Sequence, residues 1–242
     1  MSKSKLNREI VKLQRKIQPV QLQKTPIILS DSKAKHLKYE RSLPVEFNIV
    51  WWYQSGATAH DRYLFLKDNI EQAVNRYKNI VLYVWLGTCD LTKFIDSKCI
   101  DLVSDVSNSS VNDLIRNFRN IYTLISQYET VELVFLEIPV YSIVCWNKSR
   151  CHKNPEQFQA SDYILESQIN IVNRFIRETN LILRKHSPKF SCDLQNSRKS
   201  SRSATRFSYK FNAFYIDGVH PGHKLSKLWL LRIASLITVD CL

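Results

Sequence analysis

The sequence predicts an α/β protein in which a parallel sheet is sandwiched between helices. Short apolar runs alternate along the chain with longer stretches whose apolar residues recur at helical spacing. The run 80–86 is apolar or aromatic at every position, as in strands that are covered on both faces. With 4 glycines and 7 prolines among 242 residues, the chain is poor in the turns that a many-stranded all-β fold needs.

The first 24 residues predict an amphipathic basic helix. Apolar residues recur there at helical spacing, at Leu6, Ile10, Leu13 and Ile17. Seven lysines and arginines stand against one acid, Glu9. We expect residues 1–24 to form a basic N-terminal segment and residues 25–242 to form the main domain.

A second basic block covers residues 195–210, which hold five lysines and arginines and no acid. We expect this block to be a loop of the main domain. Like the first 24 residues, it contributes to a net charge of +13. Cationic segments attract polyanions, although they also occur as solvated surface. Nucleic acid or another polyanion is therefore a candidate partner through residues 1–24 and 195–210.

The first predicted strand ends at a group of small polar residues. The apolar run 26–29 begins with a proline and precedes Ser30, Asp31 and Ser32, after which a helix begins. In an open parallel sheet the ligand crevice lies at the carboxyl ends of the strands. Ser32 would present its hydroxyl there, whereas Lys33 is interpreted as a surface or substrate-steering cation. Alternatively, these polar residues are only N-caps of the next helix.

The remaining elements alternate in the same way. Strands are predicted over 45–53, 80–86 and 131–138, and helices over 61–77, 111–127, 161–183 and 225–238. The strand 45–53 is followed by Ser55 and Gly56, and the strand 80–86 is followed by Gly87, Thr88, Cys89 and Asp90. A polar stretch separates this second break from residue 110. Because carboxyl ends of parallel strands share one edge of the sheet, we expect these breaks to face one crevice.

Asp217 and His220 stand three residues apart in a turn that precedes the last helix. A carboxylate at this spacing can orient an imidazole toward a third group, which is the arrangement of a Ser-His-Asp triad. The histidine would act as a general base on a serine hydroxyl and then as a general acid. Alternatively, Asp217 is a helix cap and His220 is a surface histidine.

These residues resemble the motifs of the SGNH (GDSL-like) hydrolases. The Gly-Asp-Ser block of that family corresponds to Ser30-Asp31-Ser32, and the glycine after the second strand corresponds to Gly56. The Gly-x-Asn-Asp block corresponds to Gly87-Thr88-Cys89-Asp90, and the final Asp-x-x-His block to Asp217 and His220, followed by Pro221. The four blocks occur in the family's order over residues 25–240.

The resemblance implies a three-layer α/β/α sandwich with a parallel, flavodoxin-like sheet and a serine hydrolase that acts on an ester or acyl group. Ser32, His220 and Asp217 would form the triad, and Ser32, Gly56 and Cys89 would line the oxyanion hole. The chain departs from the family at Ser30, where the family has glycine, and at Cys89, where it has the asparagine that donates to the oxyanion. A thiol is a weak donor, so activity could be low or absent.

Two further hypotheses follow from Cys89. In the first, Cys89 itself is the nucleophile, which the neighbouring Asp90 disfavours because a carboxylate raises a thiol pKa. In the second, the chain is a catalytically weak or inactive SGNH-like module that binds nucleic acid or another polyanion. The resemblance also extends to SGNH-like domains of mobile-element proteins, which is consistent with this second hypothesis.

The cysteines as a set point to neither a metal site nor a disulfide framework. The six are scattered, at positions 89, 99, 145, 151, 192 and 241. Cys145, Cys151 and His152 are close in sequence, but no further pair completes the four ligands of a structural zinc site. We expect no metal and no cofactor. No apolar run reaches the roughly 18 residues of a membrane span, and the N-terminus is polar, so we expect an intracellular protein, cytoplasmic or nuclear and not secreted.

Overall fold

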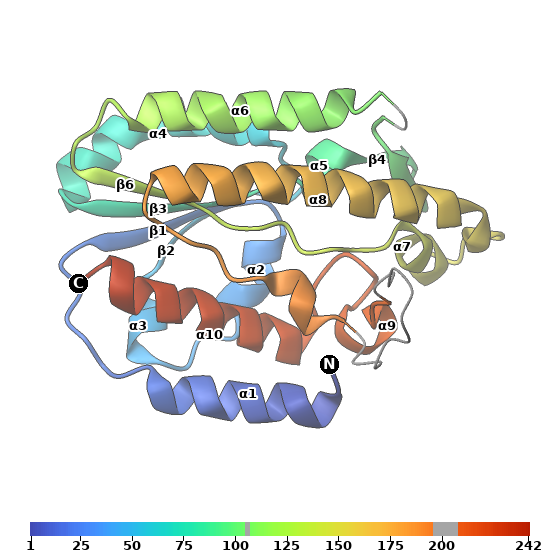
Figure 1. Ribbon diagram of the computed structural model, residues 1–242, viewed down its shortest axis with the longest axis horizontal. Helices are drawn as coiled ribbons and strands as arrows, with labels where there is room; N and C mark the ends of the chain where they lie inside the picture. The colour runs from blue at the N-terminus through green and yellow to red at the C-terminus, as the bar shows by residue number, and fades with distance from the viewer. Residues whose placement is uncertain (105–106, 196–207) are drawn as a thin grey trace.

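The computed structural model describes residues 1–104, 107–195 and 208–242, and a parallel sheet forms its centre (Figure 1). Within these residues the sheet has four strands in the order β2-β1-β3-β6. The strands are β1 (Thr25–Ser30), β2 (Val50–Tyr53), β3 (Ile80–Trp85) and β6 (Val131–Phe135), and every neighbouring pair is parallel. Every residue of β3 is buried, which agrees with its uninterrupted apolar sequence.

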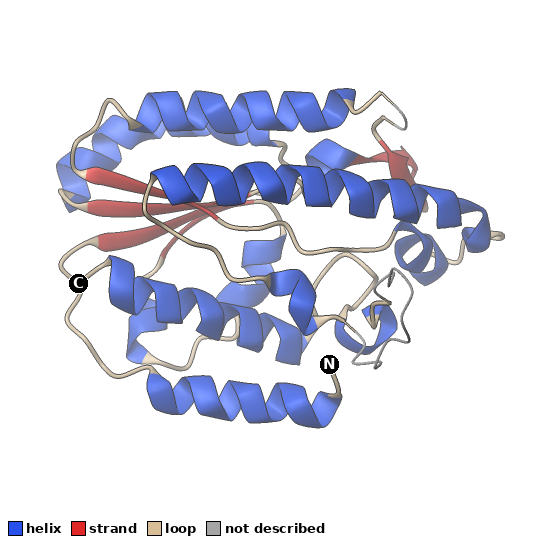
Figure 2. Cartoon of the chain, in the orientation of Figure 1, coloured by secondary structure: helices blue, strands red, loops and turns tan. Residues whose placement is uncertain are grey.

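Helices cover both faces of this sheet, as Figure 2 shows. One layer contains α4 (Ala59–Tyr77), α6 (Ser109–Ile125) and α8 (Gln159–Ile182), which pack side by side. The opposite layer contains α2 (Lys33–Lys38), α3 (Pro44–Phe47) and α10 (His223–Asp240). The predicted three-layer sandwich with a parallel sheet is therefore confirmed.

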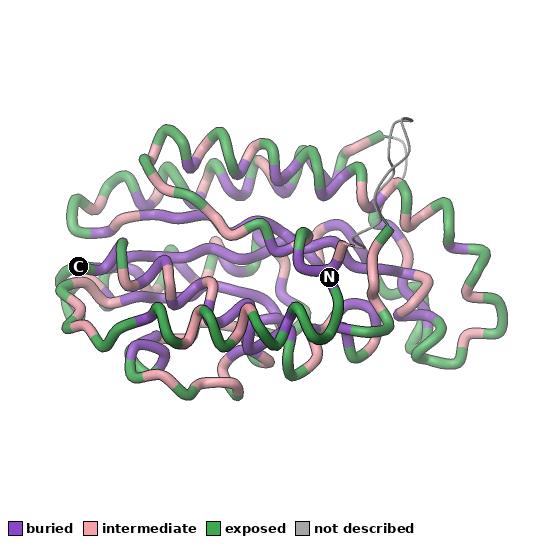
Figure 3. The backbone as a smooth tube through the Cα atoms, turned by 60° about the horizontal axis from the view of Figure 1, so that its bottom comes forward, coloured by how far each residue is buried: buried purple, intermediate pink, exposed green. Residues whose placement is uncertain are grey.

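The basic N-terminal segment forms α1 (Lys3–Lys16), which packs against α10 outside the second layer (Figure 1). Its apolar side is held there by Leu6, which is buried. The chain after α1 returns to the sheet beside the C-terminus, where the Cys241 carbonyl accepts hydrogen bonds from the Gln23 and Lys24 N–H groups. In Figure 3 most residues of α1 are exposed, whereas β1 and β3 are almost entirely buried.

The predicted strand over 45–53 is wrong in its first half, because α3 occupies residues 44–47. Pro44 stands at the first position of that helix, where its missing N–H costs no hydrogen bond. The Glu46 carboxylate accepts hydrogen bonds from the Ser42 and Leu43 N–H groups. It also forms an ion pair with the Lys227 ammonium at 2.9 Å. These tertiary contacts outweigh the β propensity of the apolar residues in this stretch.

The polar stretch after β3 has structure that the sequence analysis did not predict. It forms α5 (Thr88–Leu91) and then an antiparallel hairpin of β4 (Thr92–Asp96) and β5 (Cys99–Leu102). A further short helix, α7 (Ile143–Ser149), packs against this hairpin. The buried Asn147 side chain accepts from the Ile100 N–H at 2.8 Å and donates to the Ile100 carbonyl at 3.0 Å, which fixes the hairpin on α7.

Of the predicted basic loop 195–210, residues 196–207 lie outside the described residues. Its two ends meet, because Gln195 forms an isolated antiparallel bridge with Tyr209. Two short helical segments flank it, a 3-10 helix at Phe190–Asp193 and α9 (Phe211–Phe214), and another 3-10 helix, Pro155–Phe158, precedes α8. None of the described helices combines the length and the apolar character needed to cross a membrane.

Candidate active site

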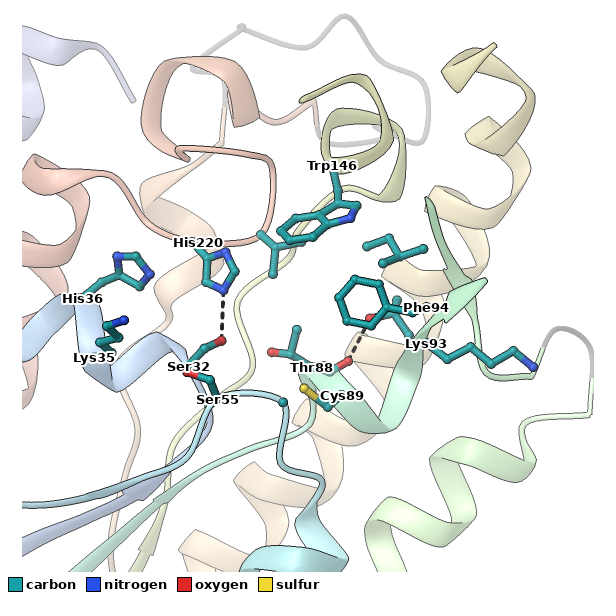
Figure 4. A pocket seen from close by; sticks show the side chains of 14 residues that line it. Ser32, Lys35, His36, Ser55, Thr88, Cys89, Lys93, Phe94, Trp146 and His220 are labelled. Atoms are coloured by element: carbon teal, nitrogen blue, oxygen red, sulfur yellow. Dashed lines mark hydrogen bonds between the residues drawn. The ribbon is translucent and has the colours of Figure 1, made fainter. Parts of the chain in front are cut away.

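A pocket of about 510 Å³ lies at the carboxyl ends of β1, β2 and β3 (Figure 4). Four of the five residues predicted for the site line it, namely Ser32, Gly56, Cys89 and His220. The fifth, Asp217, contacts His220 on the side away from Ser32. Residues separated by about 190 positions along the chain thus meet at one edge of the sheet, as the parallel topology requires.

Ser32 stands between β1 and α2, and its side chain makes no capping hydrogen bond to the helix. Its Oγ lies 3.0 Å from His220 Nε2. The preceding Ser30 does not have positive φ, and its hydroxyl donates to the Trp85 carbonyl of the adjacent strand at 2.9 Å. A serine therefore fits where the family has glycine.

His220 is held between Ser32 and Asp217. Its Nδ1 lies 2.8 Å from Asp217 Oδ2, and because a carboxylate can only accept, Nδ1 carries the hydrogen. In the neutral imidazole, Nε2 is then free to accept the hydrogen of the Ser32 hydroxyl. The second oxygen of Asp217 accepts from the Val219 and His220 N–H groups at 3.1 and 2.8 Å, so both oxygens are used within this turn.

The pKa of Asp217 reflects two opposing effects. Burial raises this pKa. The hydrogen bonds from the His220 side chain and backbone and from the Val219 N–H lower it by more than burial raises it, so the pKa lies below its ordinary value. Asp217 is therefore ionised at neutral pH and orients the imidazole. The neighbouring His36 lines the same pocket, with its ring centroid 5.0 Å from that of His220. Burial and the nearby His220 lower the pKa of His36.

Gly218 fits the turn of Asp217 and His220 tightly against α7. Its φ is +92°, and a Cβ there would lie 2.5 Å from Cys145 Cβ, 2.8 Å from Trp146 N and 2.9 Å from Ser142 O. Its carbonyl accepts a hydrogen bond from Ser142 N–H at 3.0 Å. The start of α7 is in turn fixed to α8, because Asp162 accepts from the Ser142 hydroxyl at 2.6 Å.

The second and third motif blocks are joined by Asp90, the last residue of the third block. Its carboxylate accepts the N–H of Ala59, at the start of α4, at 2.9 and 3.1 Å. This contact holds the loop that contains Gly56, whose φ is +79°, beside α5. Burial raises the pKa of Asp90 to about 7 despite these hydrogen bonds.

Cys89 faces the pocket from α5 with its sulfur toward the interior of the site (Figure 4). Burial, followed by the nearby Asp31 carboxylate, raises the pKa of its thiol to about 12. Cys89 is thus a neutral thiol at physiological pH. The thiolate needed for a nucleophilic cysteine is strongly disfavoured, which argues against the hypothesis that Cys89 is the nucleophile.

The interpretation of Lys33 as a surface cation is wrong. Its side chain is only 2% exposed, and it forms an ion pair with the fully buried Asp31. Its ammonium also donates to Thr88 Oγ1 at 2.5 Å and lies 5.5 Å from the centre of the Trp85 ring. Lysine is rarely buried unless it is paired, so the residue type alone predicted an exposed position for Lys33. Its place directly after a strand end was the one signal for an internal role.

Sequence reasoning also missed the apolar wall of the pocket. Phe94 of β4 and Trp146 of α7 face each other edge to face, with their ring centroids 6.2 Å apart (Figure 4). Ile100 of β5 lines the same pocket. The adjacent apolar pair at 94–95 inside a polar stretch was one sequence signal for this wall. Among the residues with a described position, no group of three histidine, cysteine or acidic side chains is arranged to hold a metal ion.

Comparisons with solved structures identify the fold. A GDSL-like lipase from Bacteroides thetaiotaomicron matches with a TM-score of 0.61 and 12% identity, over 97% of this chain and 98% of that one. A catalytic mutant of an acetylxylan esterase from Geobacillus stearothermophilus matches with a TM-score of 0.54 and 11% identity, over 91% and 96% of the two chains. No family model and no curated protein sequence matches.

The chain therefore has a three-layer α/β/α architecture around a parallel sheet. More particularly, it has the SGNH, or GDSL-like, hydrolase fold, as its four sequence blocks indicated.

Proposed function

We propose that the protein is a serine hydrolase that cleaves an ester, with Ser32 as nucleophile, His220 as general base and Asp217 as the residue that orients His220. The proposal is supported above all by one observation, the continuous chain of contacts from Ser32 Oγ through His220 to Asp217 at 3.0 and 2.8 Å. These distances lie within the hydrogen-bond reach that nucleophile activation needs.

In this mechanism Ser32 Oγ forms a bond to the ester carbonyl carbon while its proton moves to His220 Nε2. The carbonyl oxygen becomes an anion that the N–H groups of Ser32 and Gly56 would hold, together with the side of the pocket that Cys89 lines. Collapse of this intermediate breaks the bond to the alcohol oxygen, which takes the proton from His220. Water then attacks the acyl group by the same route, releasing the acid and restoring Ser32.

The apolar wall suggests which esters fit. Phe94, Ile100 and Trp146 line the pocket that Ser32 and His220 also line, and the Trp146 ring centroid lies 5.7 Å from that of His220. Phe94 is largely exposed on the hairpin, although it faces the buried Trp146, so its aromatic surface is available to a substrate. We infer that an apolar acyl or alcohol group would lie against this wall, because burying it there removes apolar area from water.

A fluorophosphonate probe tests the proposal without knowledge of the substrate. We expect it to modify Ser32, because the probe phosphonylates a serine, with loss of fluoride, when a base activates the hydroxyl. Mass spectrometry of the labelled peptide would locate the modification, and Ser32→Ala would serve as the control. Folded wild-type protein that stays unlabelled, or that is labelled at another residue, would contradict the proposal.

A second candidate function, polyanion binding, is favoured by the outer surface of α1. Arg8, Lys12, Arg15 and Lys16 are exposed there, and across the described chain none of them forms an ion pair with a carboxylate. The helix is anchored to α10 by its apolar side, so these charges project from a fixed surface. This arrangement could bind nucleic acid alongside the ester site.

Replacing these four residues with glutamine should weaken binding to a short DNA duplex and flatten its salt dependence. Each lost phosphate contact reduces the slope of log K against log salt by about 0.9, so the slope should fall by roughly 3 to 4. A matched variant with Lys67, Lys98, Lys148 and Lys153 changed to glutamine removes the same charge from other exposed positions. Equal effects of the two variants, or no binding at low salt, would exclude α1 as a specific surface.

A further inference from the structure

The site contains a second hydroxyl that the proposed mechanism leaves unused. Thr88, at the start of α5, lines the pocket that Ser32 and His220 line, yet it is only 7% exposed. In Figure 4 its hydroxyl oxygen lies on the side of the residue that faces Ser32. The residue directly after it is Cys89, which supplies a weak donor where the family has an asparagine.

The hydrogen-bond partner of Thr88 determines where its hydroxyl hydrogen can point. The Lys33 ammonium lies 2.5 Å from Thr88 Oγ1, and an ammonium can only donate, so the threonine oxygen accepts there. Its own hydrogen must point elsewhere. Throughout the described chain, no carbonyl, carboxylate or hydroxyl group accepts a hydrogen bond from Thr88 Oγ1. The hydroxyl is therefore available to a ligand in the pocket.

The groups behind Thr88 fix this hydroxyl and increase its strength as a donor. Lys33 is held by the fully buried Asp31 and by its contact with the Trp85 ring, so the ammonium has little freedom to move. A cation that donates to a hydroxyl oxygen withdraws electron density from it, and the hydroxyl becomes a better donor in turn. A preorganised donor in a site of low polarity is what stabilises an oxyanion.

We propose that the Thr88 hydroxyl, polarised by Lys33, donates a hydrogen bond to the oxyanion of the tetrahedral intermediate. This inference rests on the proposed esterase function and extends it. Thr88 takes the place of the side-chain donor that Cys89 cannot supply, and Lys33 acts as a positioning residue through Thr88. No proton is transferred in this contact, so it alters the stability of the intermediate and leaves the proton path through His220 unchanged.

The test compares two threonines of nearly equal burial that line the same pocket. Thr88→Val removes the proposed donor, whereas Thr92→Val removes a hydroxyl that already donates to the Thr88 carbonyl at 2.9 Å, from a residue that is 8% exposed. With a short-chain p-nitrophenyl ester, we expect Thr88→Val to lower kcat by about 100-fold with little change in KM. We expect Thr88→Ser and Thr92→Val to stay within about threefold of the wild type, because neither removes a donor to the oxyanion.

A rescue separates a catalytic role from a structural one. Adding Cys89→Asn to Thr88→Val supplies a side-chain amide to the same oxyanion, and kcat should recover by at least about tenfold. Loss of packing alone would not be repaired in this way. If Thr88→Val does not fold, Thr88→Ala and Thr92→Ala carry the same comparison.

The outcomes distinguish this inference from the proposed function. An active wild type with equal kcat in Thr88→Val and Thr92→Val would overturn the role of Thr88 and leave the esterase function standing. If kcat does not recover in the double variant of Thr88→Val and Cys89→Asn, the role of Thr88 as an oxyanion donor would also be overturned. A wild type that hydrolyses no ester and is not labelled by a fluorophosphonate would overturn both.

Discussion

Replacing Ser32 with alanine should lower kcat for ester hydrolysis by about 10⁴-fold or more, because the covalent route then disappears. His220→Ala should have a similar effect, since the Ser32 hydroxyl loses the proposed general base 3.0 Å away. The two residues act as one unit, so the double variant should be within about tenfold of either single variant. Steady-state hydrolysis of a short-chain p-nitrophenyl ester measures all three.

His223 offers a matched control for the histidine. It lies three residues beyond His220, its side chain is 82% exposed, and it contacts Glu40 outside the pocket. His223→Ala should therefore retain wild-type kcat. Residual activity in Ser32→Ala close to that of the wild type would mean that the hydrolysis has another source, and the assignment of Ser32 would have to be abandoned.

Gly218→Ala should lower the free energy of unfolding by about 3 kcal/mol or more. A Cβ at this position would approach the Trp146 backbone nitrogen of α7 and the carbonyl oxygen of its N-cap, Ser142, closer than 3.0 Å, and φ of +92° adds strain for any residue with a Cβ. Relief requires the turn to move away from α7. Because that turn contains Asp217 and His220, hydrolysis should fall with the stability.

Gly56→Ala is the matched control for stability in urea or thermal unfolding. Gly56 also has positive φ, +79°, but a Cβ there would meet no atom within 4 Å. The free energy of unfolding of this variant should fall by only about 1 kcal/mol, the cost of positive φ for a residue with a Cβ. Equal destabilisation of the two variants would show that the contact with α7 contributes nothing and that backbone strain alone decides the loss.

The parts of the fold that the sequence predicted are those whose local pattern and final environment agree. β1 and β3 are apolar and lie buried in the middle of the sheet, so their composition reports their position directly. The polar breaks after these strands predicted the site, because strand ends in a parallel sheet converge at one edge.

The parts that escaped prediction depend on contacts between distant residues. The hairpin of β4 and β5 has short, partly exposed strands, and its place is set by Asn147, about 50 residues away. Glu46 and Lys227 stabilise α3 across an even longer separation. The contact of Lys33 with Thr88 likewise joins two strand ends, whereas its ion-pair partner Asp31 is only two residues away in the sequence. No local window of sequence contains both partners of such contacts.

The buried ion pair of Asp31 and Lys33 also limits which amino-acid substitutions this chain can tolerate during evolution. Losing either partner alone leaves an uncompensated charge in the interior, which costs about 3 to 5 kcal/mol, a large share of the stability of a typical domain. Exchanging Ser30 or Cys89 removes no charge, so single substitutions there face a smaller barrier. Drift away from the family motif is therefore open at these two positions, whereas Asp31 and Lys33 can be replaced only together.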